Sequence, residues 1–113
     1  MTWADAESVF EDITQATSDD DQLAQLKRDV PLYAVRYARL RTDWRLTDME
    51  TRRAMDANRR SAHNTLIDAC NILSRACGNR GRSNEWRRKL GEDRKEIGDF
   101  ACHLHAILGI LAR

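Results

Sequence analysis

The chain has very few of the residues that interrupt helices, and this scarcity excludes most β-rich folds. Its 113 residues include one proline and five glycines, too few turn-forming residues for a sheet of many short strands. Valine and isoleucine are also sparse, whereas alanine, leucine, arginine and glutamate, which favour helix, are plentiful. The composition therefore predicts an all-α protein, and the length suits a single domain, residues 1–113.

Long apolar runs are also lacking. A helix that crosses a bilayer needs ~20 apolar residues, whereas the longest apolar run here, residues 106–112, is short and contains Gly109. The first residues are acidic, unlike a secretion signal. The three cysteines are an odd number without the close pairing of a disulfide scaffold. We therefore expect a cytoplasmic protein that has no membrane partner.

The apolar residues recur at helical spacing along most of the chain. Pro31 lacks a backbone donor, so we expect a break or kink there between two short N-terminal helices. Thr47 and Glu50 have capping-box spacing and predict the start of a long helix. We expect a four- to five-helix bundle built on a long antiparallel hairpin, about residues 48–77 and 84–112, which the shorter N-terminal helices cover.

One polar cluster in the long helix could carry chemistry. Arg60, Asn64 and Asp68 are spaced four apart and share a helix face, with Arg59 and His63 beside them. His63 could act there as a general base or bind a ligand. The alternative is a boundary histidine that bonds to another helix beside an exposed ladder of ion pairs. We favour the alternative, because the sequence shows no nucleophile or second base.

The histidines and cysteines could also suggest a metal site. Cys70 lies seven residues from both His63 and Cys77, or ~10.5 Å along a helix axis. Zinc–sulfur bonds are about 2.3 Å long, so neither pair can share one ion. Only a site between helices would remain, with His63 near His103 or His105. We therefore expect neither a metal nor a cofactor.

Arginine dominates the positive charge, with sixteen arginines against three lysines. Arg80, Arg82, Arg87 and Arg88 gather in residues 79–89, and arginine suits phosphate or carboxylate. The net charge is nevertheless only +1, and residues 1–21 hold seven acids and no base. These charges predict an acidic first helix that lies across basic ones. The alternative is a basic surface that receives an acidic partner.

Trp44 and Trp86 lie near helix ends among arginines, a combination favoured at protein interfaces. Our leading hypothesis is a non-enzymatic, bacterial-type helical protein that acts through protein–protein interaction, including self-association into a homo-oligomer. The alternative is a nucleic-acid-binding accessory protein that uses the arginine-rich faces and residues 79–89. The least favoured hypothesis is an enzymatic or small-ligand site around His63.

Overall fold

Polar caps at the starts of the helices explain where most of them begin. The computed structural model describes residues 1–112, in which five helices and no strand occur. Thr2 and Asp5 form a capping box, and Asp20, Asp48 and Asp93 each accept a backbone N–H at later helix starts. The long helix is thus capped by Asp48 and not by Thr47, the cap that the capping-box spacing predicted. The helices are α1 (Trp3–Ala16), α2 (Asp21–Arg45), α3 (Met49–Asn79), α4 (Trp86–Leu90) and α5 (Arg94–Leu111).

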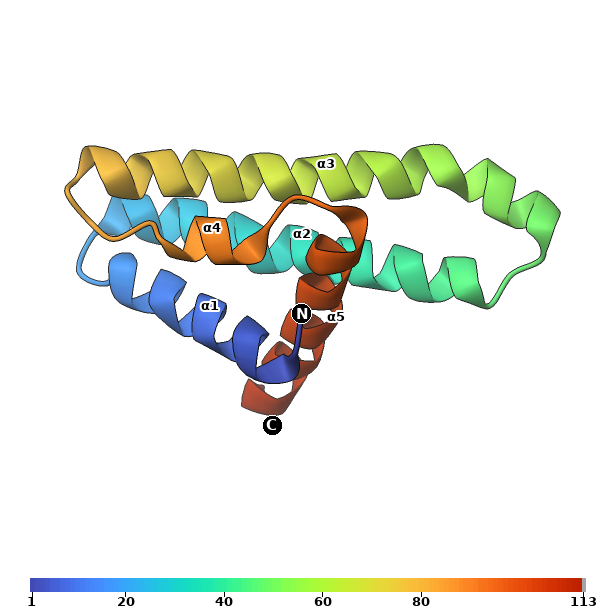
Figure 1. The fold of residues 1–113 in the computed structure, drawn as a ribbon, viewed down its shortest axis with the longest axis horizontal. Helices are drawn as coiled ribbons and strands as arrows, with labels where there is room; N and C mark the ends of the chain where they lie inside the picture. Colours follow the sequence, from blue (N-terminus) through green and yellow to red (C-terminus); the bar gives the residue numbers. More distant parts are fainter. Residues whose placement is uncertain (113) are drawn as a thin grey trace.

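The expected all-α bundle on a long antiparallel hairpin is confirmed, but the helix that pairs with α3 in this hairpin is α2. The short turn of residues 46–48 folds α2 back along α3, and the two helices lie side by side over most of their length (Figure 1). Residues 84–112, which were expected to form the helix that pairs with α3, are divided between α4 and α5. A turn this short brings the helices on either side of it into antiparallel contact. α2 therefore pairs with α3, and their apolar faces meet.

The expected break at Pro31 is wrong, because α2 is continuous through it. A proline inside a helix costs about 3 kcal/mol, through the lost N–H and the crowding of the preceding turn. Each buried leucine or valine contributes about 1.5–3 kcal/mol. Leu23, Val30, Ala34 and Tyr37 form one buried stripe of α2, and a break would turn half of this stripe away from the core. Burial therefore outweighs the proline.

Gly91 is the reason that residues 84–112 do not form one helix. Its φ of 68° and ψ of −171° suit glycine alone and end α4. Trp86 and Leu90 are fully buried and hold α4 in the core. After Gly91 the chain starts again at Asp93, and α5 runs away from α3, packing across α2 and beside α1 (Figure 1).

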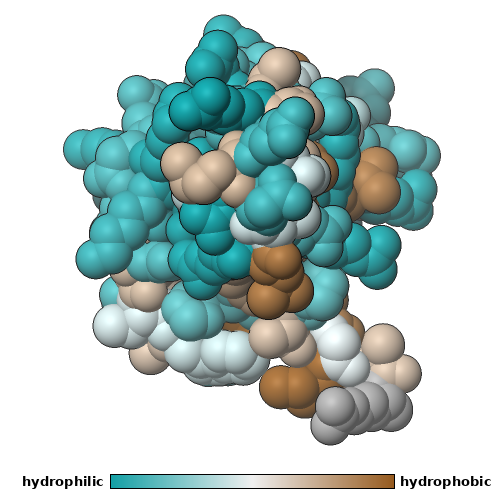
Figure 2. Space-filling model, turned by 90° about the vertical axis from the view of Figure 1, so that its right-hand side faces the viewer, coloured by the Kyte–Doolittle hydropathy of each residue, from teal (hydrophilic) through white to brown (hydrophobic). Residues whose placement is uncertain are grey.

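The core occupies only part of the hairpin. Residues 39–61, the end of α2, the turn and the start of α3, contain no buried residue; we call this segment the arm. At its tip Leu46 and Met49 are 81% and 65% exposed. Figure 2 looks at this end of the molecule and shows a mostly hydrophilic surface with a few separate apolar patches. Among residues 1–112, no helix combines the length and the apolar character needed to cross a membrane.

Replacing Pro31 tests the cost that α2 bears. We expect Pro31→Ala to raise the free energy of unfolding by about 1–3 kcal/mol, because it restores the missing N–H and removes the crowding. Urea unfolding measures this. Leu32→Ala, at the neighbouring exposed position, serves as the control and should change stability by less than about 0.5 kcal/mol. Equal or lower stability of Pro31→Ala would contradict a strained helix.

The cap of α3 predicts a dependence of stability on pH. The Thr51 N–H donates to the Asp48 carboxylate over 2.8 Å and lowers the pKa of Asp48 below its usual value of 3.8. This stabilisation is present above pH 3.8 and is lost as pH falls through the lowered pKa. Asp48→Asn keeps a capping oxygen but cannot titrate. In thermal unfolding between about pH 5 and pH 2.5, the variant should lose less stability than the natural protein; parallel curves would contradict this.

Candidate functional site

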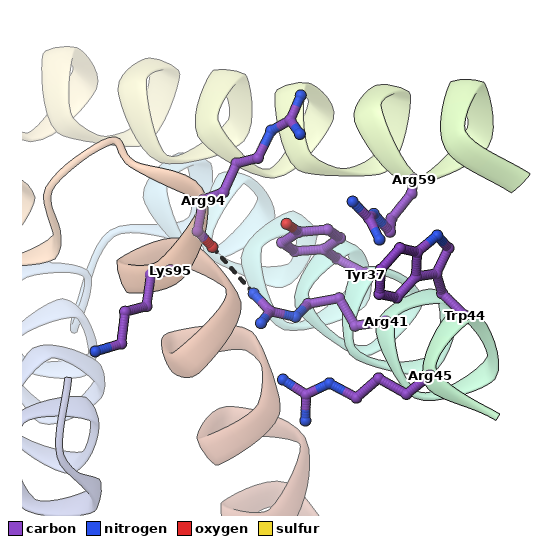
Figure 3. Close-up of a pocket in the computed structure, with 7 residues that line it drawn as sticks. All are labelled: Tyr37, Arg41, Trp44, Arg45, Arg59, Arg94 and Lys95. Carbon is purple, nitrogen blue, oxygen red and sulfur yellow. Dashed lines mark hydrogen bonds between the residues drawn. The ribbon is translucent and has the colours of Figure 1, made fainter. Parts of the chain in front are cut away.

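Two adjoining hollows lie at the base of the arm, where α2, α3 and the first turn of α5 meet. Their volumes are about 260 Å³ and 180 Å³, and they share Tyr37, Trp44, Arg59 and Arg94. Figure 3 shows the larger one, with side chains from all three helices around it. Together we call them the cationic cleft, which is lined by Tyr37, Arg41, Trp44, Arg45, Asp56, Arg59, Arg60, His63, Arg94 and Lys95.

Positive charge dominates this cleft. Asp56 is the one acidic residue in its lining, against five arginines and Lys95. None of these basic side chains forms a salt bridge with a carboxylate of residues 1–112. Figure 3 shows Arg41 and Arg45 extending from α2 toward α5, whereas Lys95 points away from the others. The arrangement is therefore a set of cations from three helices that outnumber the one carboxylate of the lining and form no salt bridge within residues 1–112.

Aromatic rings form the floor of the cleft, and basic side chains cover them. The guanidinium groups of Arg52 and Arg59 lie 4.5 Å and 4.2 Å from the Trp44 ring centroid, distances that give cation–π attraction. Arg52 also donates to the carbonyl oxygens of Trp44 and Arg45, which joins α3 to the end of α2. Tyr37 is only 2% exposed. These stacked contacts substitute for a hydrophobic core in the arm.

The structure divides the predicted cluster around His63. His63 and Arg60 line the cleft, but Asn64 and Asp68 are exposed residues outside its lining. His63 Nδ1 donates to the Asn64 side-chain oxygen over 3.2 Å, as the amide is oriented here, and its ring lies edge-on to Tyr37. His63 Nε2 is buried and has no hydrogen-bond partner among residues 1–112. Neither ring nitrogen is therefore presented to a ligand in the cleft.

The predicted basic segment, residues 79–89, mainly holds the fold together. Arg80 forms a 2.9 Å salt bridge with Asp20, and Arg82 donates to the carbonyl oxygens of Ala16 and Ser18 at the end of α1. Arg87 donates to Asn71 on α3 over 2.6 Å. Arg88 is the exposed exception, with no salt bridge or side-chain hydrogen bond within residues 1–112.

Trp86, the aromatic residue of the same segment, is 1% exposed and belongs to the core rather than to an interface. Two ion pairs, Lys89 with Asp12 and Arg80 with Asp20, join the segment to the acidic residues 1–21. The expected contact between acidic and basic regions is thus present for two of the seven acids.

Sequence reasoning did not single out most of the cleft. Its candidate site residues include Trp44, Arg59, Arg60 and His63, but not the other lining residues, which are Tyr37, Arg41, Arg45, Asp56, Arg94 and Lys95. Arg41 and Arg45 are four residues apart and flank Trp44, a spacing that places them on one helix face. That signal was available, whereas the approach of Arg94 and Lys95 depends on the crossing of α5 over α2.

The cysteines contribute packing. Cys70 and Cys77 are buried and Cys102 is half-buried, and all three are free thiols. Burial raises the pKa of Cys70 to about 12, so its thiol is protonated at neutral pH and unreactive. Within the described part of the chain, no three His, Cys, Asp or Glu residues lie close enough together to hold a metal ion.

Comparison with protein-family models, with curated proteins and with solved structures finds no match for this chain. A functional interpretation therefore depends on the geometry of the cationic cleft and of the arm.

The stacking on Trp44 predicts how the arm responds to its loss. Two cation–π contacts worth about 0.5–1 kcal/mol each should vanish in Trp44→Ala. Amide hydrogens of residues 42–58 should then exchange about tenfold faster, while those of residues 62–77 keep their protection. Hydrogen exchange followed by mass spectrometry measures this, with the exposed Arg53→Ala as control. Equal acceleration along the whole of α3 would contradict a separate role for Trp44 in the arm.

Proposed function

We propose that this chain is a non-enzymatic binding protein that recognises an acidic segment of a partner protein in the cationic cleft. The observation that carries the proposal is the gathering of six basic side chains from three helices, with no salt bridge to a carboxylate of residues 1–112. Elsewhere in the fold, Arg80, Arg87 and Lys89 do form such salt bridges. The basic groups of the cleft therefore remain available to an external anion.

Electrostatics favours an anionic occupant of this cleft. Like charges held near one another repel, and low-dielectric walls strengthen the field inside a hollow. Buried Tyr37 and half-buried Trp44 provide such walls here. Arginine presents a planar fork of donors that matches a carboxylate in two parallel hydrogen bonds. An acidic peptide segment would relieve the repulsion and use this geometry.

The aromatic rings favour protein over nucleic acid as the partner. Proteins that bind single strands stack bases on open aromatic faces. In this cleft Arg52 and Arg59 lie over Trp44, and Tyr37 is almost fully buried. The arginines of residues 79–89 are mostly engaged within the fold, which weakens the alternative of a nucleic-acid surface there. The exposed Leu46 and Met49 at the arm tip add apolar area typical of protein interfaces.

Two observations support the non-enzymatic and cytoplasmic parts of the proposal. A general base must reach the proton that it removes, whereas His63 Nε2 is buried and Nδ1 is bonded to Asn64. The three thiols are unpaired, as is usual for proteins of a reducing compartment.

A second copy of the chain could supply the acidic segment, because residues 1–21 hold seven acids and no base. Asp12 and Asp20 are engaged with Lys89 and Arg80, while Glu7 and Glu11 on α1 are exposed and form no salt bridge within residues 1–112. Light scattering at low and high salt distinguishes the cases: a homo-oligomer of this kind dissociates with salt, whereas a monomer at both concentrations assigns the cleft to a different protein.

A fluorescein-labelled glutamate-rich peptide, followed by anisotropy, tests the proposal. We expect the double variant Arg45→Ala/Arg60→Ala to bind it about tenfold more weakly, because each arginine–carboxylate contact is worth about 0.5–1 kcal/mol at an exposed site. Both side chains are exposed and make no internal hydrogen bond within residues 1–112. Arg53→Ala/Arg88→Ala removes the same charge outside the cleft and should bind as the natural protein does.

Equal weakening by both double variants would mean that only net charge matters and would overturn the proposal, as would the absence of peptide binding. A labelled single-stranded oligonucleotide serves as the parallel probe. Tighter and cleft-dependent binding of this oligonucleotide, with a steep fall in affinity on adding salt, would replace the acidic protein with a nucleic acid.

A further inference from the structure

Gly98 lies in the second turn of α5, on the buried face that packs against α2. Glycine is among the least favourable residues inside a helix, and alanine is the most favourable. A methyl group at position 98 would overlap the Nη1 and Cζ atoms of Arg41. The guanidinium of Arg41 therefore occupies the space that a side chain at position 98 would fill.

The crowding is specific to Arg41. The three atoms nearest to a Cβ at position 98 all belong to the guanidinium of Arg41, and none belongs to the backbone of α2. The group that a side chain at position 98 would displace first is therefore the guanidinium of Arg41. This distinguishes Gly98 from a small residue that merely lets two helix backbones approach each other.

Two further contacts hold the guanidinium in this seat. Nη1 of Arg41 donates to the carbonyl oxygen of Arg94 over 3.0 Å, the bond drawn in Figure 3. The Cζ atom lies 5.8 Å from the centre of the Tyr37 ring. Nε and Nη2 make no hydrogen bond within residues 1–112. Nη1 is thus used to fix the group and Nε packs against Gly98, so Nη2 remains for a ligand.

We infer that Gly98 is a positioning residue that seats Arg41 in advance, so that Arg41 receives one carboxylate group of the ligand in the cationic cleft. This inference rests on the proposed function. A free arginine side chain loses much rotamer freedom when it becomes ordered, and a side chain that is already seated avoids this loss on binding. Arg45, which is exposed and has no comparable seat, must instead become ordered when it contacts the ligand.

Gly98→Ala is the direct test, and α5 offers a matched control. Gly109 lies in the same helix, and a Cβ there would meet nothing within 4 Å. Both substitutions improve helix propensity equally. The fold should tolerate Gly98→Ala, because the atoms that must move are at the end of a flexible side chain, and circular dichroism checks this. We expect Gly98→Ala to bind the glutamate-rich peptide about three- to tenfold more weakly, and Gly109→Ala to bind it unchanged.

Arg41→Lys keeps the charge but lacks the fork, and it should weaken peptide binding as much as Gly98→Ala does. A readout that needs no ligand is the NMR signal of the Arg41 Nε–H group, assigned by its absence in Arg41→Lys. This group should be rigid in the natural protein and in Gly109→Ala, and mobile in Gly98→Ala.

The outcomes separate the inference from the proposed function. If Arg45→Ala/Arg60→Ala weakens binding while Gly98→Ala and Arg41→Lys do not, the proposed function stands and the role of Gly98 is overturned. A mobile Arg41 in the natural protein also overturns it. If the natural protein does not bind the peptide, the proposed function itself fails. Inorganic phosphate is the second probe; if it binds and depends on Gly98 while the peptide does not bind, the carboxylate is replaced by a phosphate.

Discussion

The pairing of α2 with α3 is the constraint on which the rest of the structure depends. The buried stripe of α2 is continuous from Leu23 to Ala38 only because the helix passes through Pro31 without a break. The same continuity carries Arg41 and Trp44 beyond the core into the arm, where α3 supplies Arg52 and Arg59. A kink at Pro31 would separate the two halves of this stripe and move the base of the arm away from α5, and the cationic cleft would not form.

Arginine has three distinct physical roles in this fold. Arg80, Arg82 and Arg87 tie loops and helix ends to carboxylates, carbonyl oxygens and an amide. Arg52 and Arg59 cover the Trp44 ring and stabilise the arm, which has no buried residue. The arginines of the cleft form no salt bridge with a carboxylate of residues 1–112. Composition alone cannot distinguish these roles, because each depends on what lies opposite the side chain.

Local signals predicted the helices better than their arrangement. Thr2 followed by Asp5, together with the apolar spacing, identifies where α1 begins. For α3 the predicted cap, Thr47, is one residue too early, because Asp48 caps the helix. The helix predicted to pair with α3 was wrong, because α2 before it and α5 after it both have long apolar faces. The three-residue turn at 46–48 and the backbone angles of Gly91 decide between them. The break predicted at Pro31 was wrong for a related reason. The cost of a proline inside a helix is local, whereas the burial that outweighs it depends on how α2 packs against the other helices.

The candidate site was predictable only in part. Arg59, Arg60 and His63 share α3 and were recognised as one cluster, and Trp44 on α2 was recognised separately. The contribution of Arg94 requires knowledge of how α5 crosses α2. Trp86 resembles Trp44 in its sequence surroundings, yet it is buried in the core. The difference arises because Gly91 and Leu90 fix α4 against the bundle, a relation between segments that no local pattern contains.

The three-helix origin of the cleft links its occupancy to folding. α2, α3 and the first turn of α5 come together only in the native chain, so the unfolded chain has no comparable site. Any molecule that occupies the cleft must therefore shift the folding equilibrium by mass action, in proportion to the logarithm of its concentration. Because the arm has no buried residue of its own, a bound partner would supply contacts that the arm lacks. The arm would then be more stable in the complex than in the free protein.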